Sequence, residues 1–114
     1  MLIVATELQV KNFWRVLPFV RFSVMSMKQA KKADGCLYAT ASNGGWRIGY
    51  TLTAWVSREA MLQFRNSGAH KQAMQQTGRL ARRYRTFVWE ADELPGWKQA
   101  KEKLATIHFI ELKR

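Results

Sequence analysis

The two histidines of the chain, His70 and His108, are its clearest candidates for acid–base or metal chemistry near neutral pH. Together with the one cysteine, Cys36, they do not show the spacing of metal ligands, so we expect no structural zinc site. The eight acidic residues include no recognisable carboxylate pair, and the chain has no nucleophilic serine motif, phosphate-binding loop or dinucleotide fingerprint. Hydrolytic chemistry therefore has almost no support.

His70 is the stronger candidate because it follows a break in a predicted helix. Asn66-Ser67-Gly68 interrupts that helix, and His70 stands where a second helical segment begins. Asn66 and Met74 lie four residues to either side of His70, so the three side chains can share one face. Such a histidine could bind heme iron or another metal, or move a proton. The alternative, which is the commoner case, is a surface or hydrogen-bonded histidine without a ligand.

Apolar residues ahead of His70 could supply the wall of a ligand pocket. Trp55 ends a predicted strand, and Met61 and Phe64 lie on one stripe of the helix that follows. Apolar cavities with one or two polar groups are the usual sites for small ligands. Each of these side chains, considered alone, more often belongs to a hydrophobic core. They indicate a ligand site only when taken together.

Periodic apolar patterns predict the strands that hold these residues. The sequence also contains a strong turn signal, Asn43-Gly44-Gly45, which predicts a hairpin. The predicted strands cover residues 2–10, 36–42, 46–56, 84–91 and 108–112.

Three helices are expected between these strands. The first is predicted over 21–34, because Pro18 argues against helix across 13–22. The second begins after Ser57 as N-cap, breaks at Gly68 and resumes from 69, and a short third helix covers 97–104. The order β-α-β-β-α-β, followed by a helix and a strand, predicts one α+β domain over 1–114 with ferredoxin-like topology.

The net charge of +11 favours an anionic partner, and the charge is uneven. Six lysines and arginines lie between Lys11 and Lys32 with no acid among them, and a second basic cluster covers 79–85. A solvated basic face without a specific partner is the alternative explanation.

Other features of the chain bear on its compartment and assembly. A single cysteine cannot form an internal disulfide, which favours a reducing, cytoplasmic location. No apolar run approaches the roughly 20 residues of a membrane span. The apolar start, 1–7, has no basic region ahead of it, so we interpret it as a strand and not a signal peptide. A sheet with helices on one side leaves its other face uncovered, so we expect a homodimer.

Residues 53–74 resemble the central motif of the dimeric α+β barrel superfamily. They carry a tryptophan at a strand end, a serine, an acid-alanine helix start, a phenylalanine and a histidine, in the order Trp55, Ser57, Glu59-Ala60, Phe64 and His70. The chain is similar to the antibiotic-biosynthesis monooxygenases, and nearest to the spheroidene monooxygenase-like branch. The resemblance covers residues 36–104, since Trp89-Glu90-Ala91 and Leu94-Pro95-Gly96-Trp97 also lie where such proteins turn into a final helix.

The resemblance implies a ferredoxin-like protomer, a homodimer formed through the sheets, and a pocket between sheet and helices. Some members oxygenate aromatic or polyene substrates without a metal, and others bind heme through a histidine, which His70 matches. We therefore expect a monooxygenase-like protein that binds a hydrophobic or aromatic ligand, with or without heme, and whose basic face attracts anionic groups. His70 would be the catalytic or iron-binding residue, and the ligand would contact Trp55, Met61, Phe64, Asn66 and Met74.

Two other functions remain open on the sequence. Ferredoxin-like domains also bind RNA, but they use aromatic residues on the first and third strands, and 2–10 has none. A structural or sequestering protein with a filled pocket is the other alternative.

Overall fold

The chain folds into one sheet with helices on both of its faces. The computed structural model describes residues 1–67, 75 and 79–112. In chain order the elements are β1 (Leu2–Val10), η1 (Phe13–Arg15), α1 (Val16–Lys32), β2 (Cys36–Gly44), β3 (Ile48–Trp55), α2 (Arg58–Arg65), β4 (Ala81–Glu90), α4 (Trp97–Leu104) and β5 (Ile110–Glu111).

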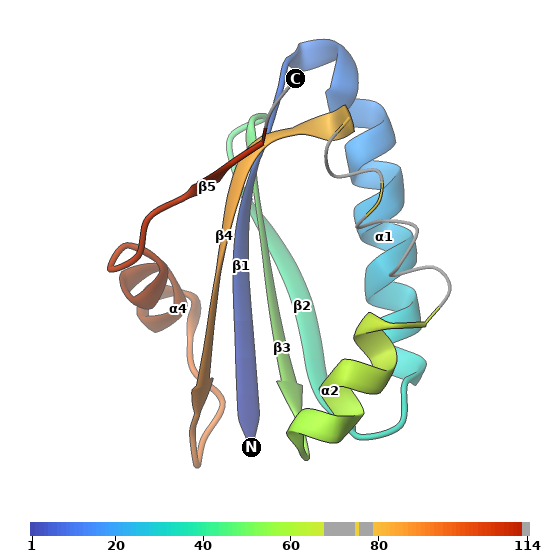
Figure 1. Cartoon of the computed structure of the whole chain (residues 1–114), viewed down its shortest axis with the longest axis vertical. Helices are drawn as coiled ribbons and strands as arrows, with labels where there is room; N and C mark the ends of the chain where they lie inside the picture. The colour runs from blue at the N-terminus through green and yellow to red at the C-terminus, as the bar shows by residue number, and fades with distance from the viewer. Residues whose placement is uncertain (68–74, 76–78, 113–114) are drawn as a thin grey trace.

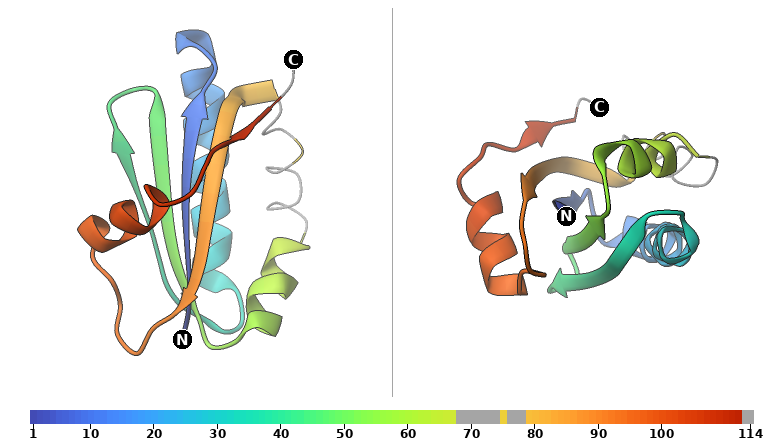
Figure 2. Two further views of the ribbon diagram at one scale, coloured as in Figure 1. Left: turned by 60° about the vertical axis from the view of Figure 1, so that its left-hand side comes forward. Right: turned by 90° about the horizontal axis from the view of Figure 1, so that it is seen from below.

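The sheet has the order β2-β3-β1-β4-β5, and all its described pairings are antiparallel. The central strand β1 pairs Leu2 with Trp55 of β3 and with Glu90 of β4. Helices α1 and α2 lie on one side of the sheet, and α4 lies on the other (Figure 1 and Figure 2). The predicted α+β class and ferredoxin-like strand order are confirmed.

Alternate residues of β1 enter two separate cores, because successive side chains of a strand point to opposite faces. On the side of α1 and α2, Leu2 packs in a cluster with Trp55 and Phe64. On the other side, Ile3 and Ala5 pack in a cluster with Ala100 and Leu104 of α4. The sequence predicted that the second face of the sheet is uncovered. That prediction was wrong, because the last helix of the chain, α4, covers part of this face.

Helix α1 begins earlier than the sequence predicts. It starts at Val16, directly after η1, and not at Arg21. Pro18 is the third residue of this helix. The first backbone N–H groups of a helix have no partner within it, so a proline there removes no hydrogen bond. The prediction of an irregular segment over 13–22 was wrong because proline breaks a helix interior, not its first turn.

Several other bounds agree with the sequence or differ by a few residues. The hairpin is confirmed, with β2 extending to Gly44 and β3 beginning at Ile48 instead of Trp46. The Ser57 cap is confirmed, since its hydroxyl accepts a hydrogen bond from the Ala60 N–H at 3.2 Å. The third predicted helix matches α4, while β4 covers 81–90 instead of 84–91, and β5 is shorter than the predicted 108–112.

The predicted helix break at Gly68 and the segment that follows it from 69 fall largely outside the described residues. Within the described part of the chain, no helix combines the length and hydropathy needed to cross a membrane.

Candidate functional site

A cavity of about 960 Å³ lies between the sheet and helices α1 and α2. This volume falls within the roughly 300–1,000 Å³ of sites that enclose small organic ligands. Its floor comes from β1, β2, β3 and β4, its side wall from α1, and one end from α2. The residues of the floor that carry the argument below are Val4, Thr6, Thr51, Thr53, Thr86 and Val88.

The middle of the floor is a row of threonines. Thr6 of β1 stands opposite Thr51 of β3 and Thr86 of β4, so the three side chains point to the same face. The hydroxyl oxygens of Thr6 and Thr86 are 3.2 Å apart and share a hydrogen bond. Because a hydroxyl both donates and accepts, this row can bind a carbonyl or hydroxyl group on an otherwise apolar ligand.

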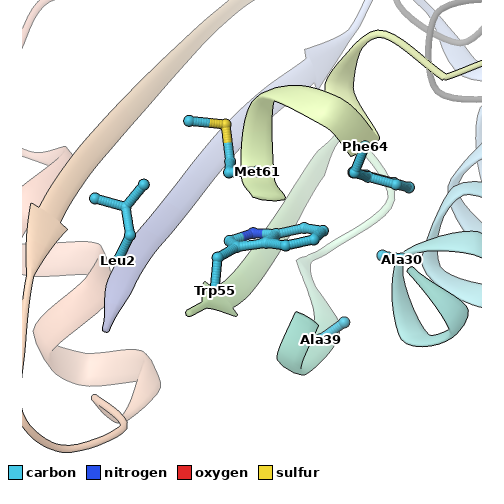
Figure 3. Close-up of a cluster of buried hydrophobic side chains, with 6 residues drawn as sticks. All are labelled: Leu2, Ala30, Ala39, Trp55, Met61 and Phe64. Carbon is cyan, nitrogen blue, oxygen red and sulfur yellow. The ribbon is translucent and has the colours of Figure 1, made fainter. Parts of the chain in front are cut away.

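Trp55 and the first turns of α2 close one end of the cavity. The indole of Trp55 is stacked on the ring of Phe64, with the ring centroids 5.2 Å apart, and Met61 packs in the same cluster. Figure 3 shows the indole beneath α2, the helix that carries both of these side chains. The Trp55 Nε1–H donates to the hydroxyl of Thr53 at 2.9 Å, which fixes the orientation of the ring. Only a small part of this end is open to the cavity, since Trp55 is 1% exposed.

The side wall depends on a close approach of α1 to β3. A Cβ atom at Gly49 would lie 2.6 Å from Cζ of Phe19 and 2.8 Å from its Cε2. The ring of Phe19 therefore rests on the bare backbone of Gly49, and this contact sets how near α1 lies to the floor.

The charges around the cavity are all of one sign. Its lining includes Lys28, Lys31 and Arg65, and it includes no aspartate or glutamate among the described residues. An anionic group on the ligand would therefore meet favourable charge at the rim.

A second, smaller hollow of about 420 Å³ lies between the C-terminal end of α1 and α2. Five of its eight lining residues are polar or charged: Gln29, Lys32, Asp34, Gln63 and Ser67. The larger cavity is the better ligand site because it combines apolar walls with a few converging hydroxyls.

The structure brings together three of the predicted site residues. Trp55, Met61 and Phe64 all line the cavity. Asn66 is exposed at the C-cap of α2 and is not among the lining residues. His70 and Met74 lie outside the described residues. Within the described ranges, no three histidines, cysteines or acids lie close enough together to hold a metal ion.

Three further polar features belong to the strands of the sheet. On the α4 side of the sheet, the buried Glu7 accepts hydrogen bonds from Nε and Nη2 of Arg85, at 2.9 and 2.7 Å. Burial, together with the nearby carboxylate of Glu7, raises the pKa of the Tyr50 hydroxyl. Burial likewise raises the pKa of the Cys36 thiol, which keeps it protonated and weakly nucleophilic near neutral pH.

The aromatic residue on the third strand that RNA binding would require is not on an open sheet face. Tyr50 lies under α4, with its ring centroid 6.3 Å from that of Trp97 and the Lys101 Nζ 4.7 Å above it. This position of Tyr50 does not favour the RNA-binding function.

The threonine row was missed in the sequence. Thr51 and Thr53 are two apart in one strand, which places them on one face, but the sequence does not say which face. Thr6 and Thr86 join them only through strand register, which depends on pairings 80 residues apart. The two-residue spacing was the one available signal.

Comparison with known proteins rests on shape. No protein-family model matches the sequence, and no curated protein matches it. Among solved structures, a candidate antibiotic biosynthesis monooxygenase from Deinococcus radiodurans superposes with a TM-score of 0.74 at 18% identity, over 84% of this chain and 97% of that one. Rv0793 from Mycobacterium tuberculosis superposes with a TM-score of 0.75 at 14% identity, over 83% and 98%.

A third similar structure is SnoaB, a cofactor-independent oxygenase from Streptomyces nogalater. It superposes with a TM-score of 0.68 at 8% identity, over 81% of this chain and 93% of that one. These structures match nearly their whole length, and at such identities the likeness establishes the fold. The chain therefore has the ferredoxin-like α+β fold of the antibiotic biosynthesis monooxygenase-like proteins, as residues 53–74 predicted.

Proposed function

We propose that the chain is a monooxygenase-like protein that binds a small hydrophobic or aromatic ligand in the cavity between the sheet and helices α1 and α2. The observation that carries this proposal is the cavity itself, about 960 Å³ in volume, with apolar walls and a row of hydroxyls along its floor. A flat, fused-ring molecule that carries one or two carbonyl or hydroxyl groups matches that distribution of apolar and polar groups.

The ligand is expected to carry or develop negative charge. Lys28, Lys31 and Arg65 lie at the lining, and the described lining has no carboxylate to oppose them. Hydrogen bonds from Thr6 and Thr51 would stabilise an enolate or phenolate oxygen more strongly than the neutral group, because hydrogen bonds to charged atoms are stronger. Together these groups would lower the pKa of a bound acidic C–H or O–H.

The reaction that fits this environment is oxygenation without a cofactor, the class to which SnoaB belongs by name. A methylene flanked by two aromatic rings loses a proton to give a stabilised carbanion, which can pass electrons to O₂. One oxygen atom becomes the ring carbonyl and the other leaves as water, so that R₂CH₂ and O₂ give R₂CO and H₂O. In this proposal His70 accepts the proton, and Trp55, Met61 and Phe64 keep water from the reacting carbon. Asn66 and Met74 are proposed to contact the ligand beside His70.

Heme binding is the alternative form of the same proposal. The described lining of the cavity contains no histidine and no cysteine, so the iron would depend entirely on His70. Titration with hemin decides between the two forms: a shift of the Soret band that is lost in His70→Ala supports heme, and an unchanged band removes it.

The oxygenase is tested with an anthrone, whose ring methylene lies between two aromatic rings. Uptake of one O₂ per anthrone, with formation of the quinone, is the expected result. Thr6→Val keeps the shape of the side chain but removes its hydroxyl, and should lower kcat/KM about tenfold by loss of a hydrogen bond to a charged oxygen. Thr106→Val, at the end of α4, is the matched control and should leave the rate unchanged. A chain that neither binds the anthrone nor changes its oxidation rate would contradict the proposal.

We also propose that the protein is a homodimer. Helix α4 leaves Tyr38 of the edge strand β2 40% exposed on the second face of the sheet, and Leu37 beside it is 53% exposed. Sedimentation equilibrium should then give twice the chain mass of 13.3 kDa. Tyr38→Glu should shift the mass toward the monomer, while Leu62→Glu, on the exposed side of α2, should not.

A further inference from the structure

One end of the molecule carries a patch of aromatic and apolar side chains that project into solvent. Trp14 is 86% exposed, Leu17 79%, Phe13 63% and Trp46 49%. The ring of Phe13 packs edge-to-face with those of Trp14 and Trp46, with centroid separations of 6.1 and 5.7 Å. These residues come from η1, the start of α1 and the turn between β2 and β3, which lie at the same end of the fold (Figure 1). We call this group the end patch.

Basic residues surround the end patch, and acids are missing from the same part of the sequence. Residues 8–33 contain no aspartate or glutamate. Lys11, Arg15 and Arg21 lie beside the aromatic residues in the chain, and the guanidinium of Arg47 lies 5.5 Å above the ring of Trp46. Exposed tryptophan among lysine and arginine is typical of surfaces that rest in the headgroup region of a bilayer.

The outer face of α1 continues this pattern away from the end patch. Leu17, Arg21, Val24 and Lys28 follow one another at steps of three or four residues, and all four are exposed; Val24 and Lys28 also stand at the rim of the cavity. The opposite face of α1 buries Ser26 and Ala30 against the sheet. A helix with one buried face and an outer stripe that alternates apolar and basic side chains suits an anionic membrane surface.

The end patch also lies at the cavity. Trp46, Val16 and Phe19 all line the cavity, and Val20, one turn after Val16, lines it as well. A ligand that entered beside these residues would pass directly from whatever surface covers the end patch to the threonine floor.

We propose that the end patch and the outer stripe of α1 dock the protein on an anionic membrane surface, and that the cavity takes an apolar ligand dissolved in that membrane. The second part rests on the proposed function. A second copy of the chain is a poor occupant, because pairing this surface with itself would bring like charges together without an acid between them. The side chains of Trp14 and Leu17 project outward, as insertion between lipid headgroups requires.

The test is co-sedimentation with vesicles of phosphatidylcholine and phosphatidylglycerol, compared with vesicles of phosphatidylcholine alone. Binding to the mixed vesicles should be more than about tenfold tighter, and it should weaken as salt is raised. Leu17→Ser should weaken it by about three- to tenfold through loss of apolar insertion. Arg21→Gln should weaken it by about fivefold through loss of one charge near the surface.

Matched variants on other surfaces separate docking from general attraction of a basic protein. Leu94→Ser removes a 49% exposed leucine beyond β4, and Arg58→Gln removes an exposed charge from α2; both should bind like the unaltered chain. Equal losses in Leu94→Ser and Leu17→Ser, or no binding to either vesicle, would overturn the proposal. So would self-association that Leu17→Ser abolishes, because it would assign the patch to a second copy.

Ligand transfer is measured separately, so that the docking step and the cavity can fail independently. Pyrene dissolved in the mixed vesicles should move to the protein, and Leu17→Ser should slow that transfer without changing the affinity for an anthrone added in solution. If the unaltered chain does not bind the anthrone, the result would count against the cavity as a ligand site. Vesicle binding with no effect of Leu17→Ser on pyrene transfer would count against delivery from the membrane.

Discussion

At the scale of single residues, the shortest and most buried ion pair of the described residues joins Glu7 and Arg85. The carboxylate side chain is 5% exposed and that of the arginine 17%, and the Arg85 Nη1 also donates to the carbonyl oxygen of Ile107 at 3.1 Å. The guanidinium also lies 4.1 Å from the ring centroid of Phe109. Arg85 therefore links the centre of the sheet to the segment that leads into β5.

Removing Arg85 alone should be costly. Arg85→Met leaves the carboxylate of Glu7 buried without its partner, which should lower the free energy of unfolding by about 3 kcal/mol or more. Glu7→Leu in the same chain should recover much of this loss, because no buried charge then remains. Urea denaturation measures the free energy of unfolding of the unaltered chain, of Arg85→Met and of the double variant. Arg83→Met is the matched control: it removes a more exposed ion pair with Glu111 and a hydrogen bond to Gln9 but leaves no charge buried, so it should cost less than Arg85→Met. Equal costs for the two arginines would contradict this account.

At the scale of elements, local signals in the sequence were sufficient where the structure depends on local chemistry. The hairpin after Asn43, the cap at Ser57 and helix α4 all depend on residues within a few positions of one another. The start of α1 was missed because Pro18 has opposite meanings in a first turn and in a helix interior. The sequence does not reveal how distant strands pair. Trp55, Met61 and Phe64 lie close together in the sequence and could be predicted as site residues, whereas the threonine row forms only through pairing of distant strands.

The packing of α1 against β3, through Phe19 and Gly49, sets the distance between the side wall and the floor of the cavity. Gly49→Ala would place a methyl group 2.6 Å from Cζ of Phe19, so the ring and with it α1 must shift. We expect a loss of about 1–3 kcal/mol in the free energy of unfolding. The cost should fall when Phe19→Leu is present, because the smaller side chain leaves room for the methyl group. A double-mutant cycle by thermal unfolding measures this coupling. Additive losses from Gly49→Ala and Phe19→Leu would show that the two residues do not press on each other.

At the scale of the whole molecule, the central strands β1 and β3 each contribute to two cores that share no residue. Leu2 belongs to the core beneath α2, while its neighbour Ile3 belongs to the core beneath α4. Both side chains are at least 98% buried, since their exposures are 2% and 0%. Because adjacent residues of β1 are fixed by the same backbone hydrogen bonds, loss of order on one face should remove the support of the other. The two cores should therefore unfold together.

This predicts a single transition that either core can weaken. Leu2→Ala and Ile3→Ala should each lower the free energy of unfolding by about 2–5 kcal/mol, the range for large aliphatic side chains truncated in a core. Circular dichroism, which follows the sheet, and tryptophan fluorescence, which includes Trp55 on one face and Trp89 and Trp97 on the other, should give coincident melting curves in both variants. Val56→Ala, at an exposed position after β3, is the control and should change the melting temperature little. If Ile3→Ala instead produced an early fluorescence step with the sheet signal intact, α4 would be a separately unfolding cover, and the two faces would be independent.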